Sequence, residues 1–217
     1  MLTNLLHRIV SVPWVYDAVQ KLAGRDRIYR WLAGYLADSS EWVVLDVGGG
    51  TGELARILSP KASYIWLDCD AQKLTGLREK IKEPRALLCD ASQIALINKS
   101  VDVAVCVAVS HHLEDAQLVD ALGELSRICR LKLIFLDAIR HPATISRLMW
   151  KYDRGSHPRS VDQLRSHIER HFVIESESRN SVLHRYWLCI ATPKTAEGDS
   201  SGDADLRSAT YGAGASQ

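Results

Sequence analysis

The segment Leu45-Asp46-Val47-Gly48-Gly49-Gly50-Thr51-Gly52 decides the fold class, because it joins a buried strand to a helix through a glycine-rich turn. The run 42–47 is mostly apolar without alternation, which is typical of a strand covered on both faces. Residues 53–58 then begin a predicted helix. Glycines let such a turn approach a ligand closely, and the following helix offers unpaired N–H groups to an acidic ligand group.

The alternation of strand and helix continues along the chain. Strands that alternate with helices predict an α/β domain with a doubly wound, mostly parallel sheet. The last two predicted strands, 172–177 and 182–191, have a connection too short for a helical crossover, so they should be antiparallel. The other predicted strands are 64–67, 86–89, 101–109 and 131–136, and the predicted helices are 71–81 and 116–129.

Three regions are expected in the 217 residues. Apolar residues recur at helical spacing in residues 1–40, which predicts an N-terminal helical cap broken at Pro13 and Gly24. Residues 41–193 contain the predicted sheet, with an insertion between its fifth and sixth strands. Residues 194–217 have almost no large apolar side chains and are predicted to be a disordered tail.

Composition excludes several classes of protein. With 27 Lys and Arg against 26 Asp and Glu, the net charge of +1 provides no field for a polyanion, so nucleic acid is not expected as a partner. Five cysteines without a Cys-x-x-Cys pair indicate buried free thiols in a cytoplasmic protein. No apolar stretch reaches the roughly 18–20 residues of a transmembrane helix, although the amphipathic N-terminus leaves weak membrane association open.

The glycine spacing separates this turn from other nucleotide-binding turns. It is Gly-x-Gly-x-Gly, whereas dinucleotide-binding proteins have Gly-x-Gly-x-x-Gly, and Glu53 stands where their third glycine would fall. A Walker-type phosphate loop is excluded, since no Gly-Lys-Ser/Thr follows. The first strand also ends at Asp46, whose carboxylate repels a pyrophosphate but suits an ammonium group, directly or through water.

Two further acids follow the next two predicted strands. Asp68 ends the second strand, where it can accept hydrogen bonds from both hydroxyls of a ribose. Asp90 follows the third strand and can accept a hydrogen bond from an adenine amino group. The carboxyl ends of parallel strands share one sheet edge, so Asp46, Asp68 and Asp90 are expected to form one site. Asp68 as a helix N-cap and Asp90 as a turn cap remain alternatives.

With these motifs the sequence closely resembles the class I S-adenosylmethionine-dependent methyltransferases. The resemblance covers about residues 41–138 and, through the antiparallel ending, extends to about 192. It implies a seven-stranded Rossmann-like sheet with a reversed last strand. The matching segments are 45–52, 65–68, 89–91, 101–105, 111–113 and 125–128. The residues expected to bind S-adenosylmethionine are Asp46, Gly48, Gly50, Gly52, Asp68, Asp90 and Ala91.

The sequence departs from the family pattern at one turn, and it is partly similar to one group within the family. The family usually has Pro-Gly-Gly before its fifth strand, where this chain has Cys129-Arg130-Leu131-Lys132. Tyr16-Asp17 and the Gly-Gly-Thr-Gly sequence are similar to the quinone-biosynthesis C-methyltransferases, but residues 150–160 are not. The departing turn should lie away from the cofactor edge, so it does not alter the expected activity.

The expected reaction is methyl transfer (EC 2.1.1.-) to a small, partly apolar acceptor such as a quinone, phenol or lipid. In-line displacement depends mainly on alignment and exclusion of water, and a base is needed only if the acceptor loses a proton early. His111 is the candidate base. No metal site is expected, because the adjacent His111 and His112 lack ligand spacing. A cluster of Trp150, Tyr152, His157 and Arg159 suggests an acceptor pocket or lid, or a packed surface segment.

Two other functions remain as alternatives. Asp68 follows Gly48 by 20 residues, a spacing that also suits the ribose of NAD(P) in an oxidoreductase. The missing third glycine and Asp46 argue against that function. A non-catalytic binding protein with a methyltransferase-like fold is the second alternative, although such a protein has no need of the glycine turn and all three acids.

Overall fold

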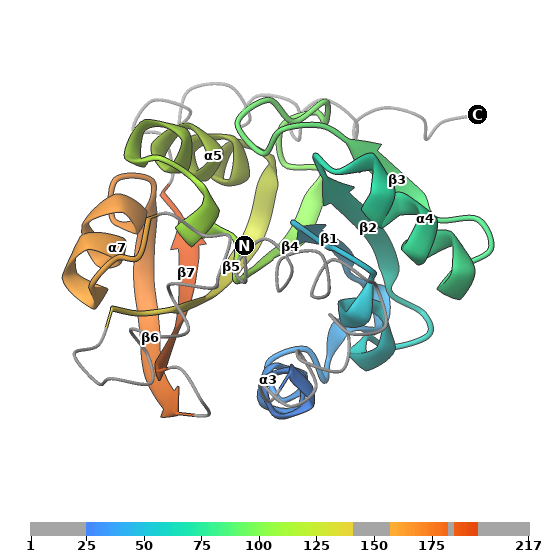
Figure 1. The fold of residues 1–217 in the computed structure, drawn as a ribbon, viewed down its shortest axis with the longest axis horizontal. Helices are drawn as coiled ribbons and strands as arrows, with labels where there is room; N and C mark the ends of the chain where they lie inside the picture. Colours follow the sequence, from blue (N-terminus) through green and yellow to red (C-terminus); the bar gives the residue numbers. More distant parts are fainter. Residues whose placement is uncertain (1–24, 141–156, 182–184, 195–217) are drawn as a thin grey trace, which may run out of the picture.

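Seven strands form one sheet, in the order β3-β2-β1-β4-β5-β7-β6 (Figure 1). Strands β1 to β5 pair in parallel, whereas β7 lies between β5 and β6 and is antiparallel to both. The predicted seven-stranded sheet with a reversed last strand is therefore confirmed. The strands are β1 Val43–Val47, β2 Ser63–Asp68, β3 Arg85–Leu88, β4 Val101–Val107, β5 Cys129–Ala138, β6 Phe172–Ser181 and β7 Arg185–Pro193.

The computed structural model describes residues 25–140, 157–181 and 185–194. Most of the expected helical cap, the segment that contains Trp150 and Tyr152, and the expected disordered tail lie outside these residues. The described part of the cap contains one α-helix, α3. The helices are α3 Arg25–Ala33, α4 Ala71–Lys80, α5 Asp115–Ile128 and α7 Val161–Ile168, with 3-10 turns η1 Ser39–Glu41, η2 Glu53–Ile57 and η3 Ser110–His112.

The segment after the glycine turn differs from the prediction of a helix over 53–58. It is the 3-10 turn η2, which follows Gly52 in a left-handed conformation and ends at Ile57. Pro60 comes three residues later and cannot continue a helix, so too little chain is available for regular α-helical turns. The first turn after the glycines is therefore tighter and shorter than expected.

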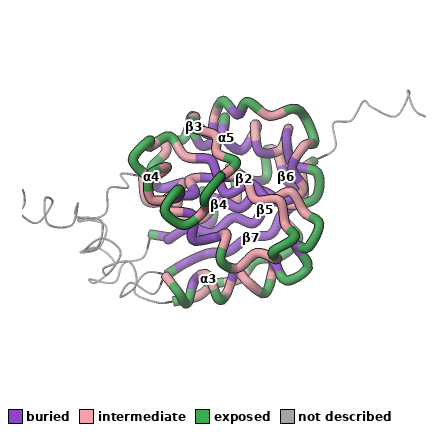
Figure 2. Tube along the Cα trace, turned by 90° about the vertical axis from the view of Figure 1, so that its right-hand side faces the viewer, coloured by how far each residue is buried: buried purple, intermediate pink, exposed green. Residues whose placement is uncertain are grey.

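Helices cover both faces of the sheet, and Figure 2 shows the buried strands beneath them. On one face α5 and α7 pack over buried side chains such as Leu45 and Phe135. On the other face α3 and η2 pack over residues such as Val44 and Ile134. Successive strand residues point to opposite faces. Asp46 therefore shares the face of α3 with Val44.

The junction of α5 and β5 has no loop, since α5 ends at Ile128 and β5 begins at Cys129. The last carbonyls of a helix lack intrahelical partners. Lys99 Nζ donates hydrogen bonds here to the carbonyls of Ser126 and Cys129, at 3.1 and 3.0 Å. The departure from the family pattern thus lies at the amino end of β5, away from the carboxyl edge of the sheet.

All five cysteines carry free thiols, as the composition predicts. Cys106, Cys129 and Cys189 are buried in the strands, and Cys89 is partly buried. Cys69 is exposed, contrary to the expectation of burial, because it follows the last residue of β2 at the sheet edge. Burial raises the pKa of the Cys106 thiol well above its usual range.

Phe135 offers a direct test of the core. Its fully buried ring lies edge-on to Trp187 at 6.1 Å between ring centroids. We expect Phe135→Ala to lower the free energy of unfolding by about 3–5 kcal/mol, measured by urea denaturation. The control Val173→Ala, 53% exposed on β6, should change it by less than about 0.5 kcal/mol. Equal effects of the two variants would contradict this assignment of the core.

Candidate active site

The glycine turn needs glycine for two different reasons. Gly48, Gly50 and Gly52 have φ angles of 64°, 51° and 75°, a region that favours glycine. A Cβ on Gly48 would lie 2.4 Å from Cγ2 of Val109, and one on Gly52 would lie 2.4 Å from Cδ1 of Leu77. A Cβ on Gly50 would meet only the Gly48 oxygen, at 3.9 Å. Gly48 and Gly52 thus allow close packing, while Gly50 leaves space for a ligand beside the turn.

Asp68 lies beside this space with acceptor capacity to spare. Its Oδ2 accepts a hydrogen bond from the Gly50 N–H at 3.0 Å, and its Oδ1 accepts one from the Asp70 N–H at 2.9 Å. A carboxylate has about four acceptor positions, so each oxygen retains one for a ribose hydroxyl. The N-cap of α4 is Asp70, whose Oδ1 accepts from the Gln72 N–H. The alternative of Asp68 as that N-cap is therefore wrong.

Asp90 lies at the neighbouring strand end. The Cys89 N–H donates to the Asp68 carbonyl at 3.2 Å, which links the segments that follow β2 and β3. Asp90 is exposed, and its Oδ1 accepts from both the N–H and the hydroxyl of Ser92 at 2.8 Å. Asp90 therefore does cap the turn, and both of the hydrogen bonds that it accepts from Ser92 are to Oδ1. Ala91, directly after Asp90, is buried.

Asp46 lies beneath the glycine turn. It is 3% exposed, and its Oδ2 accepts a 2.7 Å hydrogen bond from the Tyr64 hydroxyl. Burial raises the pKa of Asp46 to about 7; the bond from Tyr64 opposes this rise, and the charge of Asp68 adds to it. A Cβ on Gly49 would lie 3.0 Å from this oxygen. The backbone of the turn therefore lies close against the buried Asp46 carboxyl group.

Two side chains of β2 hold the turn, and neither was predicted from the sequence as part of the site. Trp66 is fully buried, and its Nε1 donates a 2.9 Å hydrogen bond to the Gly50 carbonyl. Tyr64 bonds Asp46, as described above. Residues 64 and 66 share one face of β2, and the register places Trp66 beside Asp46. The available signal was the alternation of side chains along a strand. Tyr64 and Trp66 are two residues apart, so both side chains lie on the face of the sheet that carries Asp46.

The far end of the turn is anchored to α4 by charge. Glu53 forms ion pairs with Lys80 and Arg56. Burial acts to raise the pKa of Glu53, but the neighbouring cations, Lys80 first, hold it below its usual value. Lys80 also donates to the Thr51 hydroxyl at 3.0 Å. An ion pair thus occupies the position where a dinucleotide-binding turn has its third glycine.

The segment after β4 brings His111 to the same edge. Its Nδ1 lies 2.6 Å from Oδ1 of Asp137 at the end of β5, and both side chains are buried. The Ser110 hydroxyl donates to Oδ2 of Asp137 at 2.5 Å. The His112 side chain is exposed, with its ring centroid 4.2 Å from that of His111. Ser110 and Asp137 were not foreseen, because neither belongs to a recognisable motif.

Arg159 is packed and hydrogen-bonded, which agrees with the packed-segment alternative for this residue; Trp150 and Tyr152 of the same predicted cluster lie outside the described residues. The Arg159 side chain is 4% exposed and donates to the carbonyls of Ser110 and Leu113, at 2.6 and 2.7 Å. It also pairs with Asp115 at the start of α5. The His157 N–H donates to the His111 carbonyl at 3.0 Å. Residues 157–159 therefore fix the segment that carries His111.

Other features lie away from this edge. Asp102 accepts from the Val43 N–H and pairs with Arg130, so its role is structural. Within the described ranges, no three His, Cys, Asp or Glu side chains gather as metal ligands would. Among the described helices, none has the length and apolar character of a membrane-crossing segment.

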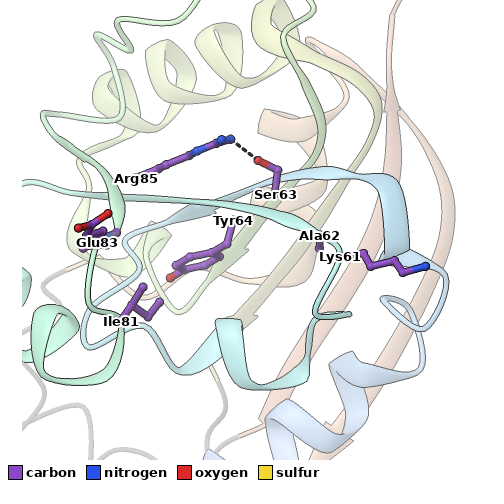
Figure 3. Close-up of a pocket in the computed structure, with 8 residues that line it drawn as sticks. Lys61, Ala62, Ser63, Tyr64, Ile81, Glu83 and Arg85 are labelled. Carbon is purple, nitrogen blue, oxygen red and sulfur yellow. Dashed lines mark hydrogen bonds between the residues drawn. The ribbon is translucent and has the colours of Figure 1, made fainter.

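A groove of about 360 Å³ lies at the opposite end of β2 and β3 from the glycine turn (Figure 3). Ser63 and Arg85 begin these two strands and are hydrogen-bonded across the groove. Tyr64 and Ile81 also line it. Among the residues that line the groove, Tyr64 also contacts a predicted site residue, because its hydroxyl donates to Asp46.

Comparisons of the sequence with known proteins identify a domain family. Residues 44–132 match the methyltransferase-domain family. An uncharacterised methyltransferase of Geobacillus thermodenitrificans is 29% identical over 136 residues, which cover 57% of this chain and 63% of that protein. The chain thus spans less than two thirds of that relative's length.

Solved structures share the fold. A protein of Pyrococcus horikoshii has a TM-score of 0.67 at 17% identity, over 83% of this chain and 92% of that chain. The magnesium protoporphyrin IX methyltransferase of Synechocystis, solved with bound SAH, has a TM-score of 0.65 at 16% identity, over 88% and 94% of the two chains. At these identities the likeness concerns the fold alone.

The raised pKa of Asp46 predicts that the difference in stability between wild type and Asp46→Asn depends on pH. An unfolded aspartate has a pKa of about 3.9, so the folded chain retains a proton that the unfolded chain releases between pH 4 and 7. This contribution to stability is present below about pH 4 and is lost as the pH rises to about 7. Asp46→Asn does not titrate, so its stability relative to wild type should rise by roughly 1 kcal/mol per pH unit and level off above pH 7.

The measurement is urea denaturation of both proteins at pH 5, 6, 7 and 8. The control is Asp162→Asn, whose side chain is 89% exposed on α7. Its stability relative to wild type should be nearly constant across this range. A constant difference for Asp46→Asn would mean that Asp46 is already ionised at pH 5 in the folded protein.

Proposed function

We propose that the chain is a class I S-adenosylmethionine-dependent methyltransferase, which transfers a methyl group from S-adenosylmethionine to a small, partly apolar acceptor; the methyltransferase-domain match over residues 44–132 supports this. One observation carries the proposal. The glycine turn, Asp68 and Asp90 come together at the carboxyl ends of β1, β2 and β3, where open α/β sheets bind their ligands.

The donor set fits the nucleoside part of S-adenosylmethionine. Asp68 has one remaining acceptor position on each oxygen, which matches the two hydroxyls of a ribose. Asp90 is exposed next to it and holds its turn through Oδ1, so Oδ2 serves the adenine amino group. The space beside Gly50 would receive the methionine portion, between Gly48 and Gly52. Ala91 would pack against the adenine.

The chain's own contribution to the reaction is alignment. S-Adenosylmethionine supplies a methyl group already activated on a sulfonium. The residues at the edge must then orient the acceptor in line with it and exclude water, which accounts for a large part of the acceleration in such displacements. Donor binding centres on β1 to β3, and His111 lies beyond β4. We assign the acceptor to the space between these two parts of the edge.

The proposed acceptor class rests on the net charge of the chain. A net charge of +1 favours a small molecule over a nucleic acid. Quinones, phenols and lipids are the acceptors to test first, since each joins an apolar body to one reactive polar group. A nicotinamide oxidoreductase is disfavoured, because the Glu53–Lys80 ion pair stands where the third glycine would be. A non-catalytic binding protein would share the donor site but show no turnover.

The proposal predicts selective binding of the sulfur nucleosides. In calorimetric titrations, S-adenosylmethionine and S-adenosylhomocysteine should bind, and NAD and NADP should not. Asp68→Ala should weaken binding by about 10- to 100-fold, on the scale of lost hydrogen bonds to a charged group. The matched control is Asp162→Ala, whose side chain is 89% exposed on α7 and which should bind as the wild type does.

Each other outcome contradicts a named part of the proposal. Binding of NAD in place of the sulfur nucleosides would identify an oxidoreductase. Wild-type affinity in Asp68→Ala would remove Asp68 from the ribose site. A folded protein that binds neither sulfur nucleoside would overturn the enzyme function.

A further inference from the structure

Cys69 and Cys89 lie opposite each other at the ends of two neighbouring strands. In the parallel pairing of β2 with β3, Asp68 is the register partner of Leu88, the last residue of β3. One residue further along, the same register places Cys69 opposite Cys89. The pairing continues to this point, because the Cys89 N–H donates a 3.2 Å hydrogen bond to the Asp68 carbonyl. Paired strands lie about 4.7–4.9 Å apart, so the two cysteines are neighbours in space.

The two side chains also belong to one face of the sheet. Successive strand side chains point to opposite faces, so residues two apart share a face. Leu67 and Leu87, each two residues before one of these cysteines, lie in or against the core cluster beneath α5. Cys89 packs against the same cluster. The alternation therefore places the Cys69 thiol on the face that carries Cys89.

The two thiols are close enough to act on each other. Burial raises the pKa of the Cys89 thiol, and the charges of Asp90 and Cys69 add to this rise. The Ala95 N–H, which donates a hydrogen bond to the Cys89 sulfur, opposes it. Cysteines form a disulfide when their Cα atoms are roughly 4.4–6.8 Å apart, a range that includes the spacing of neighbouring strands. Cys89 would then exchange its contact with Ala95 for a bond to Cys69.

This pair differs from the other cysteines in its access to solvent. Cys69 is exposed and Cys89 is partly buried. Cys106, Cys129 and Cys189 are buried within strands, where a thiol acts as a small apolar side chain and is inert. All five cysteines of the chain lie in the described ranges. Cys69 and Cys89 are thus the pair that a dissolved oxidant can reach.

The pair lies between the two acids assigned to the nucleoside. Asp68 directly precedes Cys69, and Asp90 directly follows Cys89. A nucleoside that bonds both acids must span the segments that carry the two thiols. A disulfide holds its Cβ atoms about 3.8 Å apart, which is closer than the strands are spaced, so the bridge would move these segments. Ligand contacts tolerate displacements of only about 0.5 Å.

The acids around the pair set the speed of oxidation. Burial and the charge of Asp68 raise the pKa of the Cys69 thiol, and Asp90 and Asp70 add to this effect. The thiolate is the attacking form, so a first attack on an oxidant is slow at neutral pH and faster as the pH rises. The second attack, by Cys89, is intramolecular and is accelerated by proximity. A bridge should therefore accumulate in place of an adduct on one thiol.

We propose that Cys69 and Cys89 are an oxidative modification site, at which a small disulfide such as glutathione disulfide forms a Cys69–Cys89 bridge that prevents S-adenosylmethionine binding. The effect on binding rests on the proposed function. The Cys69 thiolate attacks one sulfur of glutathione disulfide, and one glutathione thiolate leaves. The Cys89 thiolate then attacks the Cys69 sulfur of the mixed disulfide, and the second glutathione leaves. Two cysteine thiols are oxidised, one glutathione disulfide is reduced, and the leaving thiolates take up the two protons.

The bridge is tested by peptide mapping, without any nucleoside. Trypsin places Cys69 on peptide 62–73 and Cys89 on peptide 86–99. The folded protein is treated with glutathione disulfide, its remaining thiols are alkylated, and the peptides are analysed by mass spectrometry without reduction. We expect these two peptides to be joined with the loss of two hydrogen atoms, at a rate that rises from pH 7 to 9. Cys106→Ala, which removes a buried thiol, should form the same bridge.

The effect on the donor site is tested by calorimetric titration with S-adenosylhomocysteine. The bridged wild type should bind at least about 10-fold more weakly than the reduced wild type, and dithiothreitol should restore the affinity. Cys69→Ser has no exposed thiol, so oxidant treatment should leave its affinity equal to that of its own reduced form. Saturating S-adenosylhomocysteine should shift the bridge equilibrium in a glutathione buffer toward the thiols by the same factor. Circular dichroism checks that both forms are folded.

The outcomes separate this inference from the proposed function. A glutathione adduct that persists on Cys69 without a link to Cys89, or a bridge to another cysteine, would overturn the modification site. Undiminished affinity in the bridged protein would overturn the effect on binding, as would a bridged protein that has lost its folded structure. If the reduced wild type binds neither sulfur nucleoside, the proposed function fails and the effect on binding fails with it. The peptide map still decides whether the bridge forms.

Discussion

The position of the glycine turn depends on two hydrogen bonds that join Gly50 to β2. Its N–H donates to Asp68, and its carbonyl accepts from the indole of Trp66. Both the N–H and the carbonyl of Gly50 are thus hydrogen-bonded to side chains of β2. The turn can leave space for a ligand because it is fixed from behind, with Asp46 and Tyr64 below it. Without these bonds, a turn of four glycines in five residues would lose much of its order.

The convergence of three acids on one sheet edge could be predicted because it depends on where strands end. Asp46, Asp68 and Asp90 each fall at or just after an apolar run, and parallel strands bring such ends together. Their individual environments could not be predicted in the same way. Asp46 is buried, whereas Asp90 is exposed, and this difference arises from side chains such as Tyr64 that lie on another strand.

His111 was predicted from the sequence as a candidate base, but the residues that hold its segment were not. Its partner Asp137 lies 26 positions later, and Arg159, which fixes the segment, belongs to an irregular stretch. Contacts between such distant residues leave no periodic signal in a single sequence. The same limit applied to η2, where helical spacing predicted an α-helix and the nearby Pro60 left room only for a 3-10 turn. Strand directions followed from local patterns, whereas strand order and side-chain partnerships required the fold.

The insertion of β7 between β5 and β6 has a consequence for synthesis on the ribosome. The outer edge of β5 pairs with β7, for example Leu133 with Ala191, so its partner emerges long after β5 itself. Until then β5 presents unpaired N–H and C=O groups on a strongly apolar strand, which is a template for association with other chains. The β6–β7 hairpin forms from local contacts and can then close this edge in one step. Truncation before β7 would therefore favour aggregation over a smaller folded domain.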